Sequence, residues 1–168
     1  TGGYSAEYGQ ALSSVLLLNT IDEPVQEKTD ITFMTVGLGV GNTQKWDKGS
    51  FSFNTSYINL APYQEAFPDR NTWNKPVQAA SGEMVYRHKL KNDGLLKLYG
   101  AYSYTSFDLI QQDINFVDGL RFGLKNRNLY FNGSYRGFLG NNWTLQTGFS
   151  LANDNTNLNI EDDLVKNN

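Results

Sequence analysis

Apolar and polar residues alternate along most of the chain with a period of two, which predicts β-strands. The clearest case lies near the C-terminal end, where Trp143, Leu145, Thr147, Phe149 and Leu151 share one face and polar or small residues stand between them. This alternation is typical of a strand with one apolar face. No stretch shows a convincing apolar period of 3.6 residues, so we expect almost no helix beyond short turns in loops.

The same alternation predicts an all-β fold, an antiparallel meander of about six strands. The predicted strands cover residues 31–41, 51–60, 83–90, 96–105, 128–137 and 143–151. Asp93-Gly94 supplies a hairpin signal between the third and fourth of them. Each strand is about ten residues long, which is the length that crosses a bilayer at a tilt.

Short and long connections alternate between these strands. The long ones are predicted over Ala61 to Ser81, which holds three of the four prolines, and over Asp108 to Arg127. The Asn- and Asp-rich tail after Leu151 resembles the start of another long loop. Outer-membrane barrels have short turns on one side of the membrane and long loops on the other, whereas a soluble sandwich has no reason to alternate them. The pattern therefore favours a transmembrane β-barrel.

Aromatic residues fall near both ends of the predicted strands. Those near the turn ends are Trp46, Phe51 and Trp143, and those near the loop ends are Tyr57, Tyr104 and Phe107. Aromatic girdles at the two membrane interfaces have this placement, although soluble sheet cores are also rich in aromatic residues.

Composition excludes several classes of function. The net charge of -3, with no cluster of Lys and Arg, argues against nucleic acid as a partner. The absence of cysteine removes disulfides, thiolate catalysis and cysteine-ligated metals. A mean hydropathy of -0.49, with no long apolar run, leaves no candidate for a membrane-spanning helix.

Candidate chemical motifs are weak. The run Gly37-Leu38-Gly39-Val40-Gly41 resembles a phosphate-binding loop, but no helix is predicted after it, so we expect close packing against that face of the strand instead. His88 is the only histidine, which excludes a zinc site with two histidines in this chain. No nucleophile, base and orienting residue form a catalytic set, so we expect no enzyme, no metal site and no cofactor.

The first residues carry a more specific signal. The run Gly3-Tyr4-Ser5-Ala6-Glu7-Tyr8-Gly9, followed by Leu12-Ser13-Ser14-Val15, resembles the closing motif of the plug domain in TonB-dependent outer-membrane receptors. The resemblance implies three parts: residues 1–20 as the end of the plug, 21–30 as a linker, and 31–168 as the N-terminal part of a transmembrane barrel. It further implies an internal piece of a larger receptor in the bacterial outer membrane.

Members of that family import a scarce nutrient, such as a ferric siderophore, cobalamin or a glycan, with energy delivered by TonB. The resemblance thus implies TonB, a small-molecule or glycan ligand, and outer-membrane lipid as partners. Aromatic residues of the predicted long loops would be candidate ligand contacts, namely Tyr63, Trp73 and Phe116.

Two alternatives and one conflict remain at the level of sequence. The chain could be a complete small outer-membrane barrel with a structural or adhesive role, or a secreted soluble β-sandwich that binds carbohydrate.

The conflict concerns the direction of the first strand, because a first strand that rises from the plug linker would make the first connection extracellular. Either an earlier short strand lies within Leu16 to Lys28, or the sides are inverted.

Overall fold

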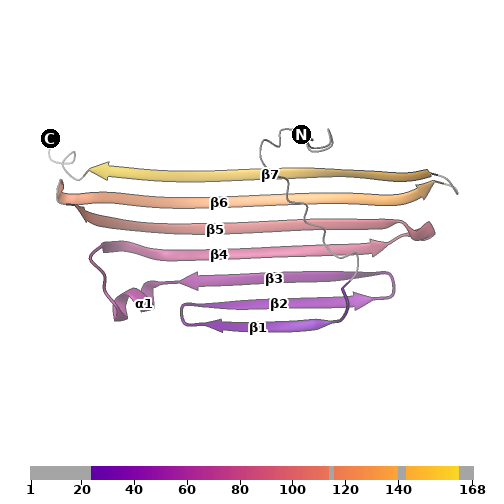
Figure 1. The fold of residues 1–168 in the computed structure, drawn as a ribbon, viewed down its shortest axis with the longest axis horizontal. Coiled ribbons are helices and arrows are strands. Elements are labelled where there is room, and N and C mark those ends of the chain that lie inside the picture. The colour runs from indigo at the N-terminus through magenta and orange to yellow at the C-terminus, as the bar shows by residue number, and fades with distance from the viewer. Residues whose placement is uncertain (1–23, 114–115, 140–142, 163–168) are drawn as a thin grey trace, which may run out of the picture.

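One antiparallel sheet of seven strands makes up the computed structural model, which describes residues 24–113, 116–139 and 143–162 (Figure 1). The strands are β1 (Lys28–Met34), β2 (Gly37–Trp46), β3 (Gly49–Asn59), β4 (Thr72–Lys89), β5 (Leu95–Asp113), β6 (Phe116–Leu139) and β7 (Trp143–Asp162), with a short helix α1 (Ala61–Ala66) and a 3-10 turn η1 (Lys91–Asp93). Neighbours in the sequence are neighbours in the sheet, so the predicted all-β antiparallel meander is confirmed, with seven strands in place of six.

The additional strand comes from a hairpin that the sequence pattern concealed. Residues 31–41 were predicted as one strand, but the chain turns at Thr35-Val36, and Met34 pairs with Gly37. β1 also starts at Lys28, inside the predicted linker 21–30. A two-residue turn that lacks Asn-Gly or Asp-Gly leaves the alternation unbroken, which hid the reversal. With this strand included, β1 starts at the same end of the sheet as the turns after β2 and β4 (Figure 1), although it overlaps the segment Leu16 to Lys28 only at Lys28.

The first predicted long loop, residues 61–81, is about half strand. β4 already begins at Thr72, and Pro76 stands within it. Proline lacks the N–H that a ladder needs, and here it falls where the pairing with β5 shifts register between Lys75 and Gln78. The remaining connection contains α1, which has a proline in its first turn and whose Ala61 N–H donates to Asn59 Oδ1 at 3.0 Å.

The second predicted long loop, residues 108–127, is wrong. β5 continues to Asp113 and β6 begins at Phe116, and the two strands pair through this region, for example Phe107 with Leu124. The predicted C-terminal loop after Leu151 is also wrong as far as the chain is described, because β7 runs on to Asp162. These strands of 19, 24 and 20 residues are about twice as long as a bilayer requires.

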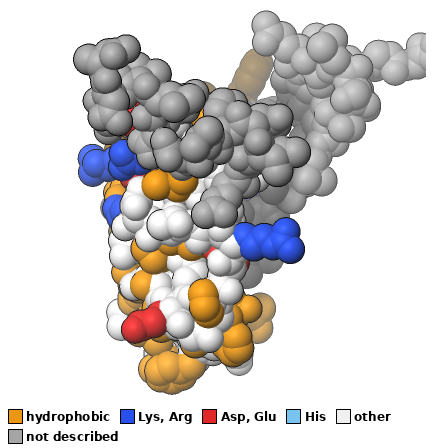
Figure 2. Space-filling view, turned by 90° about the vertical axis from the view of Figure 1, so that its left-hand side faces the viewer, with side chains coloured by type: hydrophobic (Ala, Val, Ile, Leu, Met, Phe, Trp, Pro, Cys, Tyr) orange, Lys and Arg blue, Asp and Glu red, His pale blue; other side chains and the backbone are white. Residues whose placement is uncertain are grey.

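The described part of the sheet is a single layer with almost no interior. We call face A the side that carries Phe149 and Leu151, and face B the side that carries Glu83 and Tyr130. Among the described large apolar side chains only Leu95 is buried, whereas Phe149 is 55% and Leu151 66% exposed. Exposed hydrophobic side chains are also evident in Figure 2, which views the molecule from the end that carries α1. A sheet with open apolar surface needs a further layer or an apolar solvent to be stable.

The glycines at alternate positions of β2 offer a test of the packing. They lie on face B, and what packs close to them is the neighbouring strand: a Cβ at Gly37 would meet the carbonyl oxygen of Tyr57, whereas at Gly39 the nearest atom is 3.5 Å away. We expect Gly37→Ala to destabilise the protein by about 1–3 kcal/mol through overpacking. Gly39→Ala is the matched control and should be neutral or stabilising by about 0.5 kcal/mol. Denaturant unfolding of both variants in detergent micelles measures the difference, and equal stabilities would contradict the close approach at Gly37.

Candidate functional site

Face A carries an apolar band next to the turns that follow β2, β4 and β6. On β7 the band runs from Trp143 to Leu151, and on β2 from Trp46 to Leu38, although Asn42 and Gln44 interrupt it on β2. Its large side chains on the other strands are Ile31, Phe33, Phe51, Phe53, Tyr57, Met84, Tyr86, Leu96, Leu98, Tyr102, Leu129, Phe131 and Tyr135. At about 3.3 Å per residue, the band is about 26 Å long on β2 and on β7.

No Asp, Glu, Lys or Arg of the described strands points to face A within this band, although 18% of the whole chain is charged. The charged residues of these strand segments all lie on face B: Lys28, Asp30, Lys45, Glu83, Arg87, Lys89, Lys97 and Arg136. In water both faces of an exposed sheet would tolerate charge. Exclusion from one face therefore indicates that this face is covered by apolar material.

The band is inclined to the strands. At one border, the registry places Trp46 of β2 level with Thr147 of β7, which is four positions beyond Trp143. At the other border, it places Leu38 level with Asn155, which is four positions beyond Leu151. Both borders thus shift together by about 13 Å across five strand spacings, which is about 24 Å and gives an inclination of about 30°. Strands in closed barrels tilt against the barrel axis in a similar range.

Beyond the band, the apolar positions change face. On β7 they are odd-numbered up to Leu151 and even-numbered at Leu158 and Ile160. β5 and β6 change in the same way, and Phe107, Leu124 and Leu158 lie side by side on face B. In that half of the sheet face A is polar, with Asn155, Asn157 and Asn159 on β7. The environment of each face is therefore different in the two halves of the sheet.

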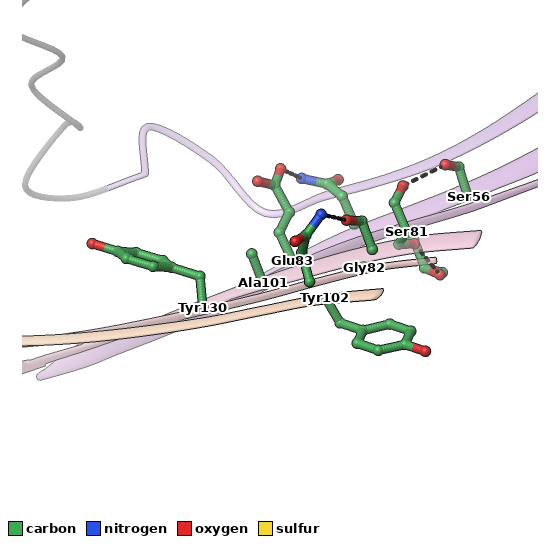
Figure 3. Close-up of a pocket in the computed structure, with 11 residues that line it drawn as sticks. Ser56, Ser81, Gly82, Glu83, Ala101, Tyr102 and Tyr130 are labelled. Atoms are coloured by element: carbon green, nitrogen blue, oxygen red, sulfur yellow. Dashed lines mark hydrogen bonds between the residues drawn. The ribbon is translucent and has the colours of Figure 1, made fainter. Parts of the chain in front are cut away.

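Within the level of the band, face B holds a groove of about 320 Å³ whose lining includes Asn54, Glu83 and Asn128. The Glu83 carboxylate accepts hydrogen bonds from Asn54 Nδ2 at 3.1 Å and from the Tyr99 hydroxyl at 3.2 Å. Ser56 and Ser81 share a hydrogen bond of 2.8 Å farther along the same groove. Figure 3 shows Glu83 and Tyr130 on one side of the sheet and Tyr102 on the other. This face can offer hydrogen bonds to a polar neighbour.

On face A, directly behind this groove, lies an apolar depression of about 520 Å³. Gly82 and Gly100 form its floor because neither has a side chain, and a Cβ at Gly82 would meet nothing closer than 3.9 Å. Its walls on this face are Phe53, Met84, Tyr102, Leu129 and Phe131. The depression has the shape and chemistry to receive a flexible hydrocarbon chain.

An ion cluster lies on face A beyond the band, across the long hairpin of β5 and β6. Arg121 donates to both carboxylate oxygens of Asp108, at 3.0 and 2.6 Å, and its other terminal nitrogen lies 3.7 Å from Glu161 of β7. Hydrogen bonds from Arg121, with a further one from Asn74, lower the pKa of the Asp108 carboxyl from its ordinary value. These contacts join β4, β5, β6 and β7 beyond the band.

The three candidate contact residues lie at the end of the sheet opposite to the band. Tyr63, on α1, is 47% exposed and its ring centroid lies 5.1 Å from that of Phe67. The side chain of Trp73 lies on face B, and its ring centroid is 6.5 Å from that of Phe107. Its indole N–H donates a hydrogen bond to the Asp69 carboxylate. Phe116 is the first residue of β6, and its side chain lies outside the described part. The structure thus places the three residues at one end without showing a common pocket.

The plug-like motif, residues 3–9, lies outside the described residues. No group of three or more potential metal-ligating side chains occurs in residues 24–113, 116–139 and 143–162. No helix in those ranges is long and apolar enough to cross a membrane.

Comparison with protein-family models, with curated proteins and with solved structures gives no match. The functional conclusion therefore depends on the residues and the sheet themselves.

Two features of functional interest were missed from the sequence. The groove around Glu83 combines residues from β3, β4, β5 and β6 and needs the strand registry to be recognised. The change of face could have been found, because the apolar positions change from odd to even within one uninterrupted segment such as 143–162. That signal was interpreted as the end of a strand.

Proposed function

We propose that this chain is part of a TonB-dependent outer-membrane receptor, comprising the end of the plug, a linker and the first strands of the barrel. Such a receptor imports a scarce nutrient through a plugged barrel. In this proposal face A is the outer surface of the barrel wall and face B lines the lumen. The plug-like motif of residues 3–9 supports the choice of family.

The observation that carries the proposal is the exchange of apolar positions between the two faces. Inside a bilayer the outer surface must be apolar and the lumen side can be polar, which matches the charge-free band on face A. Beyond the bilayer the outer surface meets water, so apolar side chains such as Phe122, Leu124 and Leu158 belong on the inner side. At the inclination of about 30°, a band of about 26 Å along the strands has a height of about 23 Å, close to the apolar height of outer-membrane barrels, about 25 Å.

The open edges support the same proposal. β1 and β7 are the two edges of the described sheet, and β7 is 20 residues long. A long exposed edge is a site for pairing with further strands, and closure removes it. Seven strands with this topology fit one section of a larger barrel, and the end beyond the band would be extracellular. Tyr63 and Trp73 would then lie on the side from which a ligand enters.

Spin labels on β7 test the proposal. These 168 residues contain no cysteine, so with any cysteine elsewhere in the complete protein replaced by serine, Thr147→Cys and Gln146→Cys place a single label on face A or face B of the band, and Asn157→Cys places one on face A beyond it. In the complete protein reconstituted in vesicles, we expect the label at position 147 to collide mainly with oxygen dissolved in the lipid. The labels at 146 and 157 should collide mainly with a water-soluble nickel chelate.

A soluble sandwich would bury position 147 in protein, so a label that neither reagent reaches would contradict the membrane wall. A small structural barrel would give the same collision pattern as the receptor. Ligand uptake by cells with and without TonB separates these two, because only the receptor loses uptake when TonB is removed.

A further inference from the structure

A cluster of positive charge borders the apolar band on face A, on the side away from the short turns. Tyr104 of β5 lies opposite Arg127 of β6, whose guanidinium is 5.7 Å from the centroid of the tyrosine ring. Lys125 follows one step farther on β6, and Lys75 approaches from β4. The pKa of the Tyr104 hydroxyl is lowered from its ordinary value by the neighbouring Ser106 hydroxyl and by the charges of Lys75 and Lys125.

Nearby carboxylates on this face are engaged elsewhere. Asp108 is the registry partner of Lys75, but both of its oxygens accept hydrogen bonds from Arg121. Glu161 also lies beside Arg121, at 3.7 Å. No acidic residue of the described strands points to face A at the levels of Tyr104 and Ser106. Lys75, Lys125 and Arg127 therefore form a local excess of positive charge.

The opposite border of the band lacks this feature. Its residues on face A include Trp46 and Trp143, and the Lys and Arg residues of the strands at that end point to face B. The cationic cluster is thus specific to one side of the proposed membrane. Among the side chains of the described strands on face A, only that border would attract an anionic ligand.

The apolar depression over Gly82 and Gly100 adjoins the cluster. The registry places Gly82, Tyr102 and Leu129 in the row next to that of Tyr104 and Arg127. A molecule with an anionic head and a hydrocarbon chain could therefore place its head against the cations and its chain in the depression. A free anion would use only the first of these two features.

We propose that Lys75, Lys125 and Arg127 bind the phosphate of a phospholipid or glycolipid headgroup, while the depression floored by Gly82 and Gly100 holds one of its acyl chains. This inference rests on the proposed function, since face A must meet lipid for the site to be reached. Charge complementarity and the continuity of the cationic cluster with the apolar band select a lipid over other occupants.

The test compares lipids bound to the complete protein in neutral detergent. Phosphatidylglycerol and phosphatidylcholine are titrated separately, and bound lipid is counted by native mass spectrometry. We expect the triple variant Lys75→Gln, Lys125→Gln, Arg127→Gln to lower the preference for phosphatidylglycerol by about tenfold or more, since each cation near an anionic surface contributes about 1 kcal/mol. The charge-matched control is Lys48→Gln, Arg70→Gln, Lys91→Gln, at exposed turn and loop positions, and should retain the preference.

Two further measurements test whether the depression holds the acyl chain and whether the bound phosphate belongs to a lipid. Gly82→Val, whose Cβ would meet no atom closer than 3.9 Å, places a side chain in the depression and should weaken binding of both lipids severalfold. Inorganic phosphate at millimolar concentration should fail to displace phosphatidylglycerol. Full displacement by phosphate, or an unchanged preference in the Lys75/Lys125/Arg127 triple variant, would overturn the lipid site.

Failure of this site and failure of the proposed function give different results. If the spin label at position 147 reports lipid but the triple variant keeps its preference for phosphatidylglycerol, only the headgroup site is wrong. If the label at position 147 does not report lipid, face A is not the lipid-facing surface of a membrane barrel, and both the proposed function and the lipid site are wrong.

Discussion

Thr147→Arg is expected to destabilise the folded, membrane-inserted protein by about 2–4 kcal/mol, because arginine on the lipid face near the middle of a bilayer is costly. Thr147 lies midway along the apolar band of β7 and its side chain is exposed. Its neighbour in the register is Tyr135 of β6. Because threonine is small, the substitution adds charge without removing a large packing group. Denaturant unfolding in lipid vesicles measures the effect.

Two matched controls on the same strand isolate the cause. Gln146→Arg places the same side chain one residue away on face B, and Asn157→Arg places it on face A beyond the band; both positions are exposed. We expect each to change the stability by less than about 0.5 kcal/mol, as surface substitutions usually do. Equal effects at positions 146 and 147 would show that the two faces meet the same environment, and the assignment of a lipid face would fail.

The second large effect concerns the chain in isolation. The 168-residue polypeptide in plain buffer is expected to show no cooperative unfolding transition, because Leu95 is the only buried large apolar side chain of its described part and both edge strands are open. Circular dichroism during a urea titration, in buffer and in detergent micelles, makes the measurement.

A cooperative transition in buffer would contradict the receptor proposal and favour a soluble sandwich. The micelle sample serves as the control for the polypeptide itself, because strand content that appears only with detergent identifies apolar solvent as the missing component. Charge-bearing Thr147→Arg in the same micelles should reduce that strand content, whereas Gln146→Arg should not.

The change of face explains most of the errors in the strand boundaries. A strand is recognised by a constant period of two, and the period within β7 breaks between Leu151 and Leu158. Asn and Asp fill the interval, as they do in loops. In the sheet these polar residues lie on the water-facing side of a strand whose pairing with β6 is continuous. Backbone pairing, which the sequence does not display, maintains the strand there.

The hairpin between β1 and β2 was missed for a different reason. Thr35-Val36 contains none of the residues that favour φ > 0 in two-residue turns, and the apolar alternation passes through it. Pairing along both strands, from Lys28 with Thr43 to Met34 with Gly37, sets the turn. Long-range hydrogen bonds therefore decided a feature that local propensity did not indicate.

The sequence by itself determined the all-β class, the antiparallel order and the inner half of β3 to β7, because one apolar face repeats at every second residue there. The sequence also carried the plug-like motif on which the choice of family depends. Only the tertiary structure decided the seventh strand, the long outer halves of β5 to β7, the inclined charge-free band and the cluster of Lys75, Lys125 and Arg127. The physical reason is that registry brings these residues together from different strands, and registry depends on pairing between segments that are distant in the chain.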